Sequence, residues 1–144
     1  MPLTSCTFLF KHLKKDVHQP TSELRLHGIL GMILQPGEKI HVVHRRLFEK
    51  DLRKHFIGVV EAYETGLVRA TGHIWVIEDP KVNIFKRHPE PRTRILALHG
   101  GTLMLNVLPP MVDLEQVQYE HVGCSIRVTD GAGWFLDLKE FGWA

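Results

Sequence analysis

Basic side chains gather in two segments near the middle of the chain. Residues 38–55 carry six Lys or Arg against three acidic side chains, and residues 86–94 carry four against one. Loops of small β-barrels often present such groups to anionic ligands. The candidate anion-binding residues are Arg45, Arg46, Arg53, Lys54, Arg92 and Arg94. The alternative is a solvated face whose cations pair with neighbours such as Glu49 and Asp51, or with the acidic C-terminal third of the chain.

Two histidines and a glutamate after a Pro-Gly turn could hold a metal ion. His41, His44 and Glu49 are of residue types that bind transition metals. The segment resembles the first motif of the cupins, and the resemblance implies a small metal-dependent enzyme with these three residues near the metal. Cupin histidines stand two residues apart, whereas these stand three apart and point to opposite faces of a regular strand. A β-bulge would be needed to bring them together, and no second cupin motif is visible around residues 101–110.

A third group of polar residues falls on one face of a predicted hairpin between residues 55 and 77. A cleft on this face could bind a small ligand, and His73 could act as a general base if a carboxylate such as that of Glu61 oriented it. Cross-strand Glu–Arg pairs on a solvated face are also routine. The cleft candidates are His55, Glu61, Arg69, His73 and Trp75.

Motifs for nucleophilic or nucleotide chemistry are missing from the sequence. It has no Gly-x-Ser-x-Gly, phosphate-binding Gly-Lys loop, GxGxxG or CxxC pattern. Cys124 falls on a predicted apolar face, where a thiol is a poor nucleophile. Whether the chain is an enzyme stays open, with a non-enzymatic role favoured.

The hairpin that would carry the cleft is the clearest element of the sequence. We predict a three-residue loop at 64–66 with Gly last, which pairs Tyr63 with Leu67. The same register pairs Glu61 with Arg69 on the polar face. It gives an apolar second face made of the pairs Phe56–Ile74, Gly58–Gly72, Val60–Ala70 and Ala62–Val68.

Two further hairpins are expected downstream. Residues 95–98 and 103–107 flank a Gly-Gly turn and are apolar on both faces, so we expect them to pair with each other and to be central and buried. Near the C-terminus we expect one apolar face made of the pairs Val128–Trp134, Ile126–Leu136 and Cys124–Leu138.

These elements predict a mainly β fold with antiparallel strands, either a sandwich or a partly open barrel, preceded by one or two N-terminal helices. The 144 residues suffice for one core, and we expect an N-terminal segment at 1–20 followed by a single globular domain at 21–144. Residues 21–34 fit either a helix or a strand.

Composition indicates an ordinary soluble chain. The net charge of +2 does not by itself point to nucleic acid, and the 44% hydrophobic residues contain no run near the ~20 needed to span a bilayer. The two cysteines are far apart and are expected to be reduced. We therefore expect a cytoplasmic protein that does not bind membranes.

The run from His41 to Tyr63, with Arg92-Thr93-Arg94 and Asn106-Val107-Leu108-Pro109-Pro110, resembles an uncharacterised family of bacterial proteins of unknown function. The resemblance spans roughly residues 38–140. It implies a bacterial, intracellular origin and brings no activity or site residues.

The leading hypothesis from the sequence is a binding or interaction domain for an anionic partner, whether protein, nucleotide or polyanion, with no cofactor expected. The first alternative is the metal-dependent enzyme described above. The second is a structural homo-oligomer, such as a homodimer, that leaves apolar surface at Trp75, Trp134 or Trp143.

Overall fold

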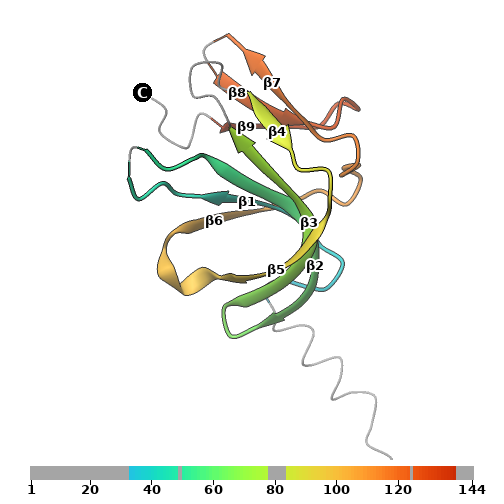
Figure 1. Ribbon diagram of the computed structural model, residues 1–144. Helices are drawn as coiled ribbons and strands as arrows, with labels where there is room; N and C mark the ends of the chain where they lie inside the picture. The colour runs from blue at the N-terminus through green and yellow to red at the C-terminus, as the bar shows by residue number, and fades with distance from the viewer. Residues whose placement is uncertain (1–32, 49, 78–83, 124, 139–144) are drawn as a thin grey trace, which may run out of the picture. The chain divides into compact units, whose positions relative to one another are not determined.

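Two antiparallel sheets make up the described part of the chain (Figure 1). The computed structural model describes residues 33–48, 50–77, 84–123 and 125–138, which belong to one compact unit. The six strands of the larger sheet are β1 (Lys39–His44), β2 (Lys54–Glu64), β3 (Leu67–Ile77), β4 (Phe85–Arg87), β5 (Arg92–Ala97) and β6 (Leu103–Leu108). The smaller sheet contains β7 (Gln118–Val122), β8 (Ser125–Thr129) and β9 (Phe135–Asp137), and a short 3-10 turn covers Leu98–Gly100.

The expected mainly β, antiparallel architecture is confirmed. The larger sheet runs β4-β3-β2-β1-β6, with β5 also on β3, and the smaller runs β7-β8-β9. The larger sheet does not close, since β5 and β6 do not pair with each other. The expected N-terminal helices, the segment 1–20 and most of the ambiguous stretch 21–34 lie outside the described residues. Within the described ranges, no helix has the length and apolar character to cross a membrane.

Each face of the larger sheet packs into a core of its own. The inner face contributes Ile40 and Val42 from β1, with Phe56 from β2, and β5 and β6 add Leu96 and Leu105 to the same cluster. Side chains from both ends of the sheet therefore meet in one interior on its inner face. Figure 1 shows the corresponding curvature of β2, β3 and β5.

The outer face of the larger sheet packs against the smaller sheet. Ile57, Trp75 and Phe85 from the larger sheet share a core with Ile126 and Val128 of β8. This arrangement buries His55 and Trp75 on the outer face of β2 and β3. The face that alternation marked as polar is therefore solvated only toward the Thr65–Gly66 turn.

The β2–β3 hairpin follows the predicted register over its first half. Phe56 pairs with Ile74 and Val60 with Ala70, as expected. A β-bulge at Glu61 then shifts the pairing, so that Ala62 faces Arg69 and Tyr63 faces Val68. The expected pairs Ala62–Val68 and Tyr63–Leu67 are wrong for this reason.

The bulge also shortens the loop and exchanges two side chains between faces. The turn contains only Thr65 and Gly66, both with positive φ, at 43° and 79°, which fits the favoured two-residue hairpin closure. Beyond the bulge Tyr63 packs on the inner core while Ala62 is exposed. One extra residue thus reverses the inside–outside alternation.

Thr65→Asn should stabilise the protein by about 0.5–1 kcal/mol, since positive φ is costly for a β-branched residue and tolerated by Asn. Chemical denaturation of the two proteins measures the difference. An unchanged or reduced free energy of unfolding would contradict the turn geometry.

β4 and β5 both pair with β3 and together form one edge of the larger sheet. Trp75 pairs with Arg87 and Gly72 with Arg92, and His88 N still donates to the Ile74 carbonyl, so the ladder is interrupted at residues 89–91. Pro89 and Pro91 cannot donate ladder hydrogen bonds, which explains the interruption. After it, β5 runs along the first half of β3 and brings Arg94 opposite Ala70.

The predicted hairpin between residues 95–98 and 103–107 is wrong. β5 pairs with β3, whereas β6 pairs with β1. β5 is an edge strand, exposed except at Leu96, and Ile95 is 71% exposed. The apolar residues of β5 therefore do not indicate a central strand.

The C-terminal hairpin has the expected faces and a different register. Val128 pairs with Leu136, and Arg127 pairs with Asp137, a shift of two residues from the prediction. The observed loop covers residues 130–134, one position later than the loop left by the predicted pair Val128–Trp134. Thr129 Oγ1 accepts from Gly131 N and donates to the Trp134 carbonyl, which fixes this loop. Because a shift of two preserves each residue's face, the apolar side chains still point into the core.

Candidate functional site

Three basic side chains line one pocket on the inner side of the larger sheet. His44 ends β1 and is the direct cross-strand partner of Lys54, which begins β2. Arg94 comes from β5. All three line a pocket of about 430 Å³, a volume in the range of small-molecule sites.

The pKa of His44 is lowered by its surroundings in the pocket. Its pKa is lowered first by burial and then by the positive charges of Lys54 and Arg94. Neither Lys54 nor Arg94 pairs with a carboxylate within the described part of the chain. The described residues that line the pocket include His55 and His88 as further histidines and no acidic side chain. The pocket therefore has a positive field without a described counter-charge.

The rest of the pocket wall is largely apolar. Phe56 and Leu96 are buried members of the inner core, and Ile74 is a half-buried neighbour of the same cluster. Val76 and Ile95 also line the pocket. Phe56 stands two residues beyond Lys54 on the same face of β2, so the charged groups lie near the strand ends and the apolar floor lies further in.

The other predicted anion-binding residues lie around this pocket. Arg45 and Arg46 line an adjoining hollow of about 390 Å³, which shares His44 and Lys54 with the first pocket and includes Asp51. Arg45 also donates to the Gly101 carbonyl at 3.4 Å.

Two predicted cations belong less directly to the pocket. Burial, followed by the charge of Arg46, lowers the pKa of Arg53 to about 10. Arg92 is exposed on β5, two residues before Arg94. Of the six predicted residues, the structure thus brings Lys54 and Arg94 into one pocket and Arg45 and Arg46 beside it.

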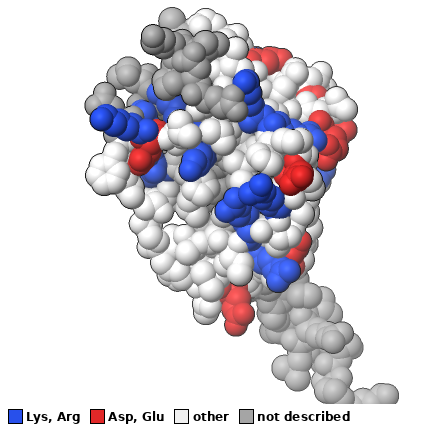
Figure 2. Space-filling view, viewed as in Figure 1, with Lys and Arg blue, Asp and Glu red and all other residues white. Residues whose placement is uncertain are grey.

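Basic side chains do not form one continuous patch on the face that Figure 2 shows. Lys and Arg occur there in separate groups, with Asp and Glu among them. The basic side chains gathered in the pocket therefore set this region apart from the rest of the molecule, whereas the mixed charges on the surface do not.

A second polar cluster lies buried between the two sheets. His41 and His55 are 0% and 1% exposed. His41 Nε2, His55 Nδ1 and the Tyr119 hydroxyl lie within 3.3 Å of one another, at 3.1, 2.8 and 3.3 Å. Asn106 Nδ2 lies 3.4 Å from His41 Nδ1. These four side chains come from β1, β2, β6 and β7, so the cluster links the smaller sheet to the larger one.

The buried surroundings of this cluster keep the imidazoles of His41 and His55 neutral. Burial lowers the pKa of His41 to about 4, and burial together with the neighbouring His41 charge lowers that of His55 to about 2. Burial also raises the pKa of Tyr119, so its hydroxyl keeps its proton and can donate to His55 Nδ1. Phe85 stacks on Tyr119 at 4.2 Å and on His55 at 4.4 Å. This is a satisfied core network.

The structure does not bring the proposed metal ligands together. His41 faces the core between the sheets, whereas His44 faces the inner pocket. Glu49 lies outside the described residues. Among the residues that are described, no group of three or more His, Cys, Asp or Glu side chains could hold a metal ion.

The five cleft candidates occupy three separate environments. His55 and Trp75 belong to the buried region between the sheets. Glu61 and Arg69 form an exposed ion pair of 2.7 Å near the turn. Hydrogen bonds from Thr71 and then Arg69 lower the pKa of Glu61.

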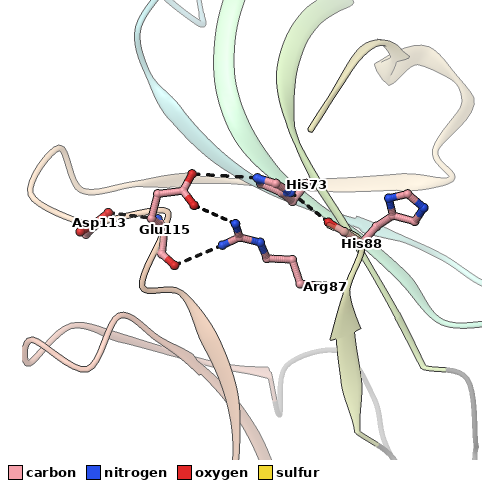
Figure 3. Close-up of polar contacts among 5 residues, drawn as sticks. All are labelled: His73, Arg87, His88, Asp113 and Glu115. Atoms are coloured by element: carbon pink, nitrogen blue, oxygen red, sulfur yellow. Dashed lines mark hydrogen bonds and ion pairs between the residues drawn. The ribbon is translucent and has the colours of Figure 1, made fainter. Parts of the chain in front are cut away.

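His73 faces Glu115, not Glu61 (Figure 3). Its Nδ1 lies 3.0 Å from the His88 carbonyl, and its Nε2 lies 3.9 Å from Glu115 Oε1. Arg87 donates to Glu115 Oε2 at 2.7 Å and to the Glu115 carbonyl at 3.1 Å. Since Glu115 already pairs with Arg87, the arrangement ties the 113–116 turn to β3 and β4.

The tryptophans assigned to an oligomer surface are only partly accessible. Trp75 is buried, and Trp134 is half-buried against the core between the sheets. Trp143 and Cys124 lie outside the described residues.

Sequence reasoning missed the apolar half of the pocket and the partners of the buried histidines. The sequence analysis singled out His44, but only as a possible metal ligand. Phe56, Ile74 and Leu96 look like ordinary core residues in the sequence, and Tyr119 is 78 residues from His41. No local pattern connects them.

No protein-family model matches the chain, and comparisons with curated proteins and with solved structures gave no match either. The resemblance to an uncharacterised bacterial family therefore stays an expectation. The functional argument depends on the geometry of the pocket.

Proposed function

We propose that the protein is a non-enzymatic binding domain for an anionic ligand, with its site in the pocket formed by His44, Lys54 and Arg94. The observation that carries this proposal is the convergence of three basic side chains on a pocket with no acidic side chain among its described lining residues. An anion bound there would neutralise a repulsion that already lowers the pKa of His44.

The chemistry of the three groups suits one acidic head group. Arg94 offers a planar fork of donors, and Lys54 offers a compact positive charge. His44 can donate from one ring nitrogen when neutral and from both when protonated. The protein supplies orientation and charge here, and the function needs no bond-making step.

Lys54→Glu and Arg94→Glu should each weaken binding of inorganic phosphate by at least tenfold, since each removes a positive charge and adds a negative one in the pocket. Isothermal titration calorimetry at low ionic strength measures this effect. Binding should also weaken as salt is added, because part of the pocket is open to solvent.

Lys50→Glu is the matched control. It causes the same change of net charge in an exposed residue that does not line the described pockets. Equal loss of affinity in Lys50→Glu and Lys54→Glu would assign binding to overall charge and contradict the proposal, and so would phosphate binding that neither pocket variant changes.

A further inference from the structure

We infer that the ligand is an amphipathic organic anion, with one acidic head group and an apolar body of several carbons. This inference rests on the proposed anion pocket and adds the class of molecule that fills it. It follows from the placement of charged and apolar side chains along the same strands.

The charged groups occupy the rim, and the apolar groups form the floor. On β2, Lys54 is exposed whereas Phe56 is buried. Phe56 pairs with Ile74 across the β2–β3 ladder, and both line the pocket. On β5, Arg94 is likewise exposed and Leu96 is buried two residues further on. Along β3, Lys54 lies opposite Val76, and Arg94 lies opposite Ala70, so the level of Phe56 and Ile74 falls between those of the two cations.

The strand spacing sets the length of the apolar body. Side chains two residues apart on one face of a strand are about 7 Å apart, twice the rise per residue. An acidic group held by Lys54 would thus require an apolar extension of several methylenes, or an aromatic ring, to cover Phe56 and Ile74. The pocket volume of about 430 Å³ leaves room for such a molecule.

Other anions would use only half of this pocket. Inorganic phosphate would meet the cations and leave Phe56, Ile74 and Leu96 without a partner from the ligand. Nucleic acid is bound by tracks of cations with exposed aromatic side chains for stacking. Phe56 is 2% exposed and forms the floor of the pocket, so it is not such a platform.

A series of straight-chain carboxylates tests the inference. Titration calorimetry at fixed pH and ionic strength would compare acetate, butyrate, hexanoate and octanoate with inorganic phosphate, 1-octanol and a single-stranded oligonucleotide. We expect affinity to rise up to about fourfold for each added methylene that is buried. Octanoate should bind most tightly, and Lys54→Glu should weaken every carboxylate.

The variant Ile74→Thr provides a second test, because it changes the apolar wall of the pocket and keeps every charge. It should weaken octanoate by severalfold and leave acetate and phosphate unchanged, because the half-buried Ile74 touches only the apolar body of the ligand. Its circular dichroism spectrum should match that of the native protein.

The outcomes separate this inference from the proposed function. If phosphate, acetate or the oligonucleotide binds at least as tightly as octanoate and Lys54→Glu weakens that binding, the anion pocket stands and the amphipathic class is wrong. If octanol binds as well as octanoate and Lys54→Glu affects neither, the pocket is apolar without charge selectivity, and the proposed function is wrong. If none of these molecules binds, both are wrong.

Discussion

The protein should lose about 3 kcal/mol of unfolding free energy as the pH falls from 6.5 to 5, because two buried imidazoles must stay neutral in the folded state. An unfolded histidine takes up its proton near pH 6.5, whereas His41 and His55 resist protonation down to about 4 and about 2. The unfolded chain therefore binds more protons in this pH range.

The direction of this pH dependence follows from the lowered pKa values of His41 and His55. The stabilising contribution of each neutral histidine is fully present above pH 6.5 and is lost as the pH falls toward its folded-state pKa. Each histidine loses about 1.6 kcal/mol over these 1.5 pH units, somewhat less than the full 1.36 kcal/mol per unit, because half of the unfolded imidazoles are already protonated at pH 6.5. The pH range from 6.5 to 5 lies above the range in which carboxylates titrate. The contribution of the two histidines can therefore be separated from that of Glu61, whose pKa is lowered.

Chemical denaturation at pH 7, 6 and 5 measures this dependence. His55→Phe removes one titrating ring while keeping a ring beside Phe85 and Tyr119, so its stability should fall by about half as much over the same range. His99→Gln replaces an exposed histidine outside the cluster and should leave the slope unchanged. A flat profile for the native protein would contradict the neutral buried cluster.

Gly72→Ala should destabilise the fold by about 3 kcal/mol or more, since a Cβ there would overlap backbone atoms of the partner strand. Gly58 and Gly72 are direct partners at the centre of the β2–β3 hairpin. A Cβ on Gly72 would meet the Ile57 carbonyl and the Gly58 Cα, and neither can move aside as a flexible side chain could. The close approach of the two backbones explains why both positions are glycine.

Gly100→Ala is the control for this prediction. A Cβ at Gly100 would contact only Thr102 Oγ1, at an ordinary 3.6 Å. The thermal midpoint of Gly100→Ala should remain near that of the native protein, whereas Gly72→Ala should melt well below it or be recovered only as aggregate. Equal stability of the two variants would show that β2 and β3 are further apart at this point.

Strand positions and faces could be predicted from the sequence, whereas registers depended on the turns. Alternation identified the apolar face of the β2–β3 hairpin up to Val60. A two-residue loop with positive φ at Thr65 was not evident, because this position usually carries Asn, Asp or Gly. In the C-terminal hairpin, alternation cannot distinguish registers that differ by two residues, so the loop hydrogen bonds of Thr129 set the pairing.

The site was only half predictable, since it depends on contacts between distant parts of the chain. Counting charges identified Lys54 and Arg94, but it could not show that both line one pocket with His44, and the pairing of β5 with β3 was not expected. The buried histidines were singled out as a metal ligand and a cleft residue. Their actual partner, Tyr119, comes from the smaller sheet.

An NMR titration with octanoate tests the central claim most directly, because it locates the ligand as well as detecting it. In ¹H–¹⁵N spectra, we expect saturable shifts at the amides of His44, Lys54, Phe56 and Arg94, with the amides of Glu61 and Arg69 unmoved. The same titration of Lys54→Glu should give much smaller shifts. Saturable shifts confined to residues outside the pocket, or no shifts at all, would contradict the assignment of an anion site to this end of the larger sheet.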